Sequence, residues 1–230
     1  MPSSIAAVTI GQSPRTDITG EIAPLLGPGV RLIEAGALDG LSREDIAALA
    51  PVGDDHTLVT RLRDGTEVLV AHRRILPLVQ ACLDRVQDEA ELILMLCTGT
   101  FPSFRTRRLL LYPDRLLFQT ARAVASDGRL GVLTPSARQI PHQERRWREV
   151  GSMVVVRAFS PYRQGDDLEA ACAALASARV DLVVLDCLGY TVALKRQVVE
   201  KVRRPALLAR TVLARTAAEI LGIDSEPRGA

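Results

Sequence analysis

The sequence has few aromatic residues and almost no excess of charge of either sign. Aromatic residues make up 3% of the 230-residue chain, and 29 Lys and Arg stand against 27 Asp and Glu, which leaves a net charge of +2. So few aromatic rings argue against a platform for stacked bases, and the small charge gives no electrostatic footprint for a phosphate backbone. We expect the arginine clusters at 105–108 and 145–148 to be solvated helix faces, and we expect no nucleic-acid partner.

Long apolar runs and closely spaced metal ligands are also missing. No run approaches the roughly 20 residues of a membrane span, and the N-terminus lacks a basic segment followed by a long apolar one. We therefore expect no membrane partner and a cytoplasmic location, where thiols stay reduced. The four cysteines lack the spacing of metal sites or disulfide frameworks. His56, His72 and His142 also lack metal spacing, so we expect surface or structural histidines and no metal.

Two stretches of the sequence share one design, an apolar run that ends in a cysteine and is followed by small polar residues. Residues 92–100 read LILMLCTGT, and residues 182–191 read LVVLDCLGYT. Each run predicts a buried strand, and a helix is expected to begin at each of its cysteines, Cys97 and Cys187. We expect these two cysteines to face each other across one cleft, whereas the other two lie on helical patterns typical of core packing.

Apolar runs and helical patterns alternate along the whole chain. This alternation predicts an α/β fold with parallel sheets that are covered on both faces. Ligands of such sheets bind beyond the carboxyl ends of the strands. Four polar loops follow predicted strands, at 11–15, 97–101, 134–136 and 187–191. The halves repeat the same order of elements, which indicates a pseudo-duplication. An Asp-Gly pair between residues 58–62 and 67–70 predicts a hairpin that decorates a sheet edge.

The paired cysteines suggest proton-transfer chemistry. A thiol, with an ordinary pKa of about 8.5, becomes a usable base near neutral pH where a helix N-terminus lowers that pKa. Two thiols on opposite faces of a carbon acid can act in turn as base and acid, which inverts a stereocentre without a cofactor. The hydroxyls of Ser13, Thr98, Thr100 and Ser136 can hold a carboxylate and stabilise an enolate-like oxyanion.

Two interpretations stay open for several of the loop residues. Arg15 either binds a substrate carboxylate or is an exposed arginine near a helix start, and Gln12 and Ser13 share this balance. Thr134 and Ser136 are expected first as helix caps, with a substrate contact as the alternative.

The loop around Cys187 contains two further candidates. Tyr190 either closes the pocket or packs within the loop. A carboxylate at Asp186 would raise the pKa of the neighbouring thiol. We therefore expect Asp186 to accept hydrogen bonds from backbone N–H groups of the loop.

Three segments carry a resemblance to a known family. Residues 9–15 (TIGQSPR), 41–44 (LSRE) and 185–190 (LDCLGY) resemble the AroM family, and the likeness extends to about Gly222. The wider relatives of that family are the aspartate/glutamate racemase superfamily, which includes cofactor-independent racemases, maleate isomerase and arylmalonate decarboxylase. The resemblance implies two Rossmann-like parallel-sheet halves related by pseudo-twofold symmetry, with a ligand cleft between them and one cysteine from each half. We expect residues 1–113 plus 206–230 to carry Cys97, and 114–205 to carry Cys187.

The sequence departs from the superfamily at both cysteine motifs. The first motif of the superfamily reads Cys-Asn-Thr, whereas here Thr98 follows Cys97, so the asparagine that helps to bind substrate is missing. The second motif reads Cys-Thr, whereas here Leu188 follows Cys187. These changes argue against amino-acid racemisation more than against the fold, and a substrate without an α-amino group is one consequence.

We therefore expect a cofactor-independent racemase or isomerase that acts on a small carboxylate, such as an amino acid, a hydroxy acid or a dicarboxylate. The alternatives are a decarboxylase or lyase that uses one cysteine, and a non-catalytic regulatory protein that binds a small acid. A homodimer stays open, since exposed helices in such folds often pair. The expected acid and base are Cys97 and Cys187. The expected substrate contacts are Gln12, Ser13, Arg15, Thr98, Gly99, Thr100, Thr134, Ser136, Leu188, Gly189 and Tyr190.

Overall fold

Strands and helices alternate along the chain, as the apolar runs predict. The computed structural model describes residues 3–163, 165 and 167–223. The elements of the first part are β1 Ser4–Thr9, α1 Thr16–Leu26, β2 Arg31–Gly36, α2 Arg43–Ala48, β3 Thr57–Arg61, β4 Glu67–Ala71, α3 His72–Val86, β5 Leu92–Met95 and β6 Leu109–Leu111. Those of the second are α4 Pro113–Ala125, β7 Arg129–Thr134, the 3₁₀ helix η1 Ala137–Gln139, α5 Ile140–Trp147, β8 Met153–Ala158, α6 Leu168–Ser177, β9 Leu182–Leu185, α7 Val192–Val202, β10 Ala206–Leu208 and α8 Ala209–Ile220. Among the described residues, every helix is too short or too polar to cross a lipid bilayer.

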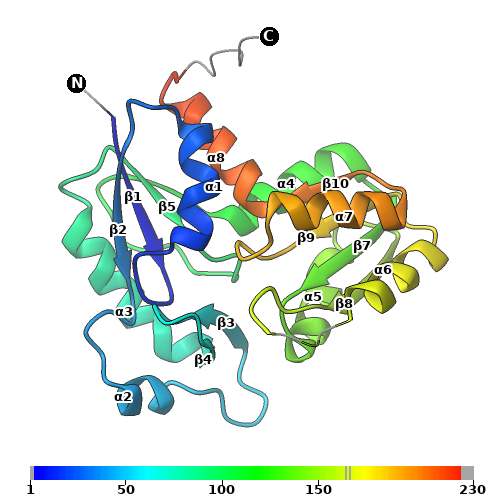
Figure 1. The fold of residues 1–230 in the computed structure, drawn as a ribbon, viewed down its shortest axis with the longest axis horizontal. Helices are drawn as coiled ribbons and strands as arrows, with labels where there is room; N and C mark the ends of the chain where they lie inside the picture. Colours follow the sequence, from blue (N-terminus) through cyan, green and yellow to red (C-terminus); the bar gives the residue numbers. More distant parts are fainter. Residues whose placement is uncertain (1–2, 164, 166, 224–230) are drawn as a thin grey trace.

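Two parallel sheets of four strands form the two halves of the molecule (Figure 1). The first sheet has the order β2-β1-β5-β6, and the second has the order β8-β7-β9-β10. Each half therefore places its first strand next to its second on one side and next to its third on the other. This shared order confirms the predicted fold of two Rossmann-like halves with pseudo-twofold symmetry.

The inner strands β1, β5, β7 and β9 are almost wholly buried because helices cover both faces of each sheet. In β1, Ile5 and Ala7 pack into an apolar cluster that includes the side chains of α1. The residues between them, Ala6 and Val8, pack into a second cluster that includes the side chains of α3. Side chains of a strand alternate between its faces, so a strand that is buried on both sides reads as a continuous apolar run.

Helix α8 joins the halves. It follows the second sheet and packs against α1 and α4, and Figure 1 shows α1 and α8 side by side. One apolar cluster contains Ile5 and Leu94 of the first sheet, Leu130 and Leu182 of the second, and Leu213 of α8. The two halves therefore share a continuous core on this side of the molecule.

The expected first half, residues 1–113 plus 206–230, is wrong at strand β10. Ala206–Leu208 pairs with β9, so these three residues belong to the second sheet. A three-residue strand has too little apolar pattern to indicate its partner from sequence. The chain then returns to the first half, where α8 contacts α1. Residues 224–230 lie outside the described residues, and the rest of the division stays a prediction.

The predicted hairpin is present, but its predicted place at a sheet edge is wrong. Strands β3 and β4 form an antiparallel sheet of their own and pair with neither four-stranded sheet. Leu58 and Thr60 of β3 are buried, and β3 contacts η1 of the second half. The hairpin therefore reaches from the first half towards the second, opposite the core that α8 helps to form (Figure 1).

Candidate functional site between the two halves

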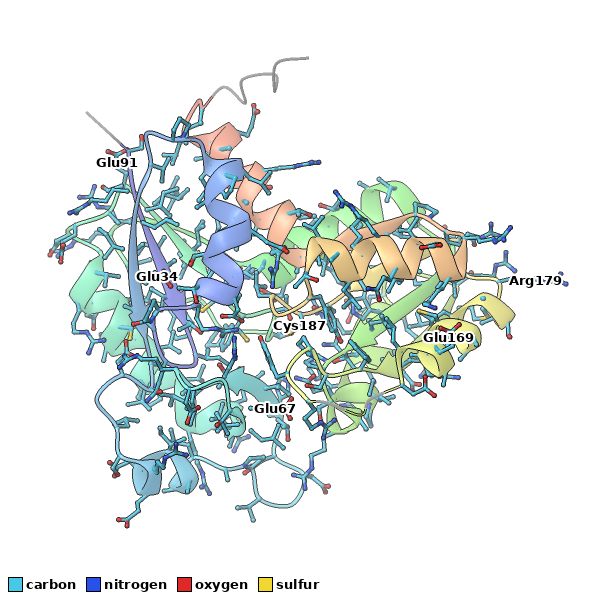
Figure 2. The ribbon with its side chains drawn as sticks, viewed as in Figure 1. Glu34, Glu67, Glu91, Glu169, Arg179 and Cys187 are labelled. Carbon is cyan, nitrogen blue, oxygen red and sulfur yellow. The ribbon has the colours of Figure 1, made fainter. Side chains whose placement is uncertain are left out.

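Cys97 and Cys187 occupy equivalent positions in the two halves. Each cysteine lies two residues beyond the end of its strand, Cys97 after β5 and Cys187 after β9. Each Sγ accepts a hydrogen bond from the backbone N–H of the glycine two positions later, at 3.4 Å from Gly99 and 3.3 Å from Gly189. Figure 2 shows Cys187 at the boundary between the halves. The Cys-x-Gly sequence therefore forms the same small loop twice.

The helix expected to begin at each cysteine is not there, so this prediction is wrong. The chain stays irregular from residue 96 to residue 108, and α7 begins at Val192, five residues after Cys187. Pro102 disfavours helical backbone for the residue before it, which keeps the first loop open. Glycine N–H groups take the place of helix N-termini as donors to the two sulfurs.

Neither of the two glycines has room for a side chain. A Cβ on Gly99 would lie 2.8 Å from Cδ2 of Leu58 in the hairpin. A Cβ on Gly189 would lie 2.7 Å from Cγ of Pro161 and would overlap Tyr162. The hairpin therefore packs directly on the Cys97 loop, and the segment after β8 packs directly on the Cys187 loop.

Both sulfur-bearing side chains line one cavity, which we call the thiol cavity. About 480 Å³ in and around it is free of protein atoms, open solvent included, but only about 20 Å³ can hold the centre of a water molecule. A single water needs about 10–15 Å³ by that measure, so the walls are close together. Eight predicted site residues line this cavity: Arg15, Cys97, Thr98, Gly99, Thr100, Cys187, Leu188 and Gly189.

Hydrogen bonds around the thiol cavity connect one half to the other. The Thr98 hydroxyl donates to the backbone oxygen of Asp186 at 3.0 Å, which joins the two cysteine loops. Gln139 of η1 donates from Nε2 to the backbone oxygen of Thr57 in the hairpin at 3.0 Å. The structure is therefore a closed arrangement, in which the loops and the hairpin hold the second half.

Arg15 lies in the cavity wall with its side chain 3% exposed. Its Nε and Nη2 donate to the two carboxylate oxygens of Asp17 at 2.8 and 2.7 Å, and Nη2 also donates to the hydroxyl of Tyr162 at 2.8 Å. Tyr162 comes from the second half, so this contact also crosses the cavity. The exposed-arginine interpretation is wrong, because these partners hold the guanidinium inside the wall.

A pair of buried carboxyl groups lies beside Cys97. Asp186 accepts hydrogen bonds at Oδ2 from Nη1 of Arg146 (2.9 Å) and Nε1 of Trp147 (3.1 Å), so its expected role as a loop cap is wrong. Asp114, at the start of α4, is 3% exposed. The Oδ1 atoms of both aspartates are buried without a hydrogen-bond partner. Burial, together with the charge of Asp186, raises the pKa of Asp114 to about 6.

The two thiols differ in their electrostatic surroundings. Burial, together with Cys187 and Asp114, raises the pKa of Cys97 to about 12, against the opposite effect of the Gly99 N–H. Burial raises the pKa of Cys187 to about 11, while its glycine N–H and the positive charge of Arg15 act in the opposite direction. Cys187 is therefore the more easily ionised of the two.

Three histidines that are far apart in the sequence form a stack of rings, and two of them lie in the cavity wall. The ring of His56 lies 4.2 Å from the ring of His142 and 4.9 Å from the ring of His72, measured between centroids. His56 and His142 line the thiol cavity. Among the described residues, no group of three or more His, Cys, Asp or Glu side chains is arranged to hold a metal ion.

Gln12 and Ser13 do not line the cavity, although their loop follows β1. The Gln12 side chain donates to the backbone oxygen of Leu38 and accepts from the backbone N–H of Arg63. The Ser13 hydroxyl donates to Asp39 at 2.5 Å. Both side chains therefore hold the loop against its own half and do not reach the thiols.

Thr134, Ser136 and Tyr190 also lie outside the cavity walls. The Thr134 hydroxyl donates to Oε1 of Gln139 at 2.8 Å and so orients a residue that does line the cavity. Ser136 caps η1, as its first interpretation predicts. The Tyr190 hydroxyl donates to the backbone oxygen of Phe159 at 2.6 Å, which holds it within its own half.

Sequence reasoning missed several residues of the wall. They lie in or next to the hairpin, in η1 and α5, and in the irregular segment after β8. None of these segments directly follows a strand of the first four-stranded sheet. The missed polar residues are His56, Thr60, Gln139, His142, Gln143 and Tyr162. A weak signal was available in the glycine of each Cys-x-Gly motif, since glycine often marks a close approach of another segment.

Two parallel four-stranded sheets with one strand order, one in each half, define the class of Asp/Glu racemase-like folds. Allantoin racemase from Klebsiella pneumoniae has this fold, with a TM-score of 0.61 and 13% identity over 99% of this chain and 91% of that chain. Unliganded arylmalonate decarboxylase has a TM-score of 0.59 with 15% identity over 99% and 94% of the two chains. Aspartate racemase from Picrophilus torridus has a TM-score of 0.56 with 10% identity over 96% and 94%.

The family follows from the sequence. The family model described as AroM protein matches residues 5–221, so this chain belongs to the AroM family. No curated protein sequence matches the chain. At 10–15% identity the structural likenesses establish the fold alone.

Proposed function

We propose that this protein catalyses cofactor-independent proton transfer at the carbon next to the carboxylate of a small acid, as a racemase or isomerase. Cys97 and Cys187 are the acid and the base. The observation that carries this proposal is that both cysteines, held in the same Cys-x-Gly loop, line one small cavity from opposite halves. Such a pair can serve the two faces of one carbon atom.

In this reaction the Cys187 thiolate takes the proton from the carbon next to the carboxylate. The electron pair of the broken C–H bond moves into the carboxyl group and forms an enediolate. The Cys97 thiol then gives its proton to the opposite face of the carbon, and the electron pair forms the new C–H bond. Cys187 ends as the thiol and Cys97 as the thiolate. After product release, Cys187 loses its proton to water and Cys97 takes one up from water, which restores the starting form for the next turnover.

The electrostatics favour Cys187 as the base that starts the reaction. Its pKa of about 11 is the lower of the two, because Arg15 and Arg210 offset part of the effect of burial. Both thiols are neutral in the ligand-free protein at pH 7, so the reaction should accelerate as the pH rises. The Thr60 hydroxyl is buried in the cavity wall without a partner, and it can donate to the oxyanion as negative charge develops there.

A solvent-exchange experiment tests this function. A panel of chiral hydroxy acids, amino acids and dicarboxylates is incubated with the protein in D₂O, and deuterium at the carbon next to the carboxylate is followed by NMR. We expect exchange with inversion for one member, and a loss of about 10²–10⁴-fold in Cys97→Ser and in Cys187→Ser, since each removes an acid–base group. Cys172→Ala, a core cysteine on α6, is the matched control and should keep full activity.

Retention of activity in either active-site variant contradicts the two-thiol reaction. Absence of exchange for the whole panel, at pH 9 as well as at pH 7, contradicts proton abstraction by this protein.

A second candidate is a decarboxylase that uses one thiol, and the raised thiol pKa values favour it. A thiol that only donates a proton needs no thiolate in the resting enzyme. In this reaction the C–C bond to a carboxylate breaks, carbon dioxide leaves, and the electron pair stays on the carbon until one thiol protonates it; water then returns a proton to the thiolate. Release of carbon dioxide from substituted malonates, with only one of the two Cys→Ser variants inactive, would distinguish this reaction.

A further inference from the structure

The contact between His56 and His142 connects the two halves, in addition to the hydrogen bonds described above. His56 precedes strand β3 of the hairpin, and His142 lies in α5 of the second half. Their rings stack with an angle of 28° between the planes. Both line the thiol cavity, and both also line an open groove outside it. The two imidazoles therefore form the partition between the cavity and the open groove.

The ring nitrogens at this partition have unused hydrogen-bonding capacity. Nε2 of His142 is buried without a hydrogen-bond partner. The third ring of the stack differs, because Nε2 of His72 donates to the backbone oxygen of Thr100 at 2.9 Å. A polar atom that is buried without a partner costs about 1–3 kcal/mol. An acceptor supplied by a ligand would remove that cost.

The charges around the partition favour an anion. Among the described residues, no Asp or Glu lines the thiol cavity, and Arg15 is its cationic side chain. An ammonium group in the cavity would therefore find no carboxylate in the wall. An anion would find the imidazoles and Arg15, whose charge is shared with Asp17. The charged groups that act on the histidine stack or line the two open grooves beside it are Asp54, Asp55, Arg73, Asp114, Arg115, Arg138, Arg145, Arg146, Glu149 and Asp186.

We infer that His56 and His142 form a binding site for an anionic group of the ligand at the mouth of the thiol cavity. The ligand is then a small acid with two anionic groups and no ammonium group, one carboxylate lying near the thiols and the other on the histidines. The placement of the first carboxylate rests on the proposed function. The site itself rests on the stacked pair, the unpartnered Nε2 and the absence of carboxylates from the described cavity wall.

Proton uptake on binding is a consequence of this site. Burial, with the neighbouring histidines and Arg145, lowers the pKa of His56 to about 4, and burial also lowers the pKa of His142. Both rings are therefore neutral at pH 7. An anion beside an imidazole favours the charged form and raises its pKa. A ring whose pKa rises towards the solution pH takes up a proton, so the affinity for the anion increases as the pH falls.

Calorimetry with succinate as the probe tests this inference without any turnover. Titrations between pH 8 and pH 6, in two buffers with different ionisation enthalpies, measure affinity and proton uptake together. We expect succinate to bind with uptake of up to one proton, and its affinity to rise by up to about tenfold per pH unit for each proton taken up. Propionate, which has one carboxylate, should bind more weakly and without that pH dependence. Aspartate, which adds an ammonium group to succinate, should also bind more weakly.

Three histidine variants provide the comparison. His56→Asn and His142→Asn should each lower the affinity for succinate about tenfold and remove the proton uptake. His72→Gln is the matched control, because it removes a ring of the same stack that does not line the cavity, and it should keep both. Circular dichroism and urea unfolding verify that each variant is folded.

Several outcomes overturn the site. Failure of succinate to bind at millimolar concentration at pH 6 does so, and so does binding that is unchanged in His56→Asn and His142→Asn. The Cys97→Ser/Cys187→Ser double variant separates this inference from the proposed function. If it binds succinate with proton uptake while the unmodified protein shows no deuterium exchange with any acid, the anion site is right and the proton transfer is wrong.

Discussion

Asp114 has a carboxyl group that the fold keeps away from water without giving it a full set of partners. Its Oδ1 atom is buried and unpartnered, and the charge of Asp186 lies nearby. Burial raises the pKa of Asp114 to about 6, from an ordinary value of 3.8. The folded protein therefore holds a proton on this group over a pH range in which the unfolded chain has lost it.

The raised pKa of Asp114 makes the protein less stable above about pH 6 than it is below pH 3.8. Between pH 3.8 and about 6 the folded state binds more protons than the unfolded state, so the free energy of unfolding decreases as the pH rises through this range. Above pH 6 the contribution of Asp114 is constant. Asp114→Asn removes the ionised form. We expect the variant to be about 2–3 kcal/mol more stable than the original protein at pH 8, and similar to it at pH 4.

Urea unfolding at both pH values measures this difference. Asp54→Asn, which changes an exposed carboxylate, is the control and should leave the unfolding midpoint unchanged. A loss of stability in Asp114→Asn at pH 8 would contradict the prediction, because it would mean that Arg146 stabilises the ionised carboxylate by more than burial destabilises it. Because Asp114 raises the pKa of Cys97, the variant should also alkylate faster at Cys97 above pH 6.

At the scale of elements, the β3–β4 hairpin closes the thiol cavity. Besides the hydrogen bond between Gln139 and Thr57, Glu67 of β4 accepts a hydrogen bond from the Ser160 hydroxyl and pairs with Arg163 at 3.7 Å. Figure 2 shows Glu67 on the side of the hairpin that faces the second half. The cavity is too narrow for a small acid as it stands, so part of its wall must move to admit one, and we expect the hairpin to be that part.

Removal of these hairpin contacts should expose the thiols. A hydrogen bond contributes about 1 kcal/mol, which corresponds to a change of about fivefold in the population of an open form. We therefore expect Glu67→Ala and Gln139→Ala each to speed the labelling of Cys97 and Cys187 by iodoacetamide about fivefold. Mass spectrometry of peptides separates these two thiols from the core cysteines.

Arg43→Ala is the control for the hairpin. Arg43 pairs with Asp64 in the turn of the same hairpin, and this exposed pair does not reach the second half. Labelling at the original rate in this variant, together with faster labelling in the other two, supports a hairpin that opens. Equal rates in all three variants and the original protein would assign access to another part of the wall.

The same elements show how far the sequence predicts the site. Residues 92–97 and 182–187 are local apolar runs, and a run that ends in a cysteine places that residue at a strand end whatever the rest of the chain does. The cavity between them was predictable because the order of elements repeats. Most of the wall depends instead on contacts between distant segments: Leu58 packs on Gly99, and Tyr162 packs on Gly189. No local pattern specifies these contacts.

The histidines are an example of the same limit. His56, His72 and His142 have no common spacing, and each comes from a different element. Their rings stack because the segment before β3 lies next to α5. That contact depends on how the whole molecule packs. The cysteine chemistry was therefore open to prediction at the level of elements, whereas the groups that surround a ligand were not.

At the scale of the whole molecule, Arg210 joins both halves to one cysteine loop. Its side chain is fully buried in α8. Nε and Nη2 donate to the backbone oxygen of Leu188, next to Cys187, at 3.0 and 2.6 Å. Nη1 pairs with Glu21 of α1 at 2.8 Å and also donates to the backbone oxygen of Asp17. One guanidinium therefore connects the first half, α8 and the loop that carries Cys187.

Loss of this guanidinium should weaken the whole fold more than loss of a surface ion pair. In Arg210→Met the buried oxygen of Leu188 loses both guanidinium donors and Glu21 loses its ion-pair partner, and we expect a decrease of about 3 kcal/mol in the free energy of unfolding. Arg129→Met, which breaks an exposed pair with Asp181, is the control and should cost at most about 1 kcal/mol. Arg210 also lowers the pKa of Cys187, so the variant should alkylate more slowly at Cys187 at a given pH. Urea unfolding and the rate of alkylation measure the two effects, and equal losses of stability in the two variants would mean that the halves are held together by their apolar core without this tie.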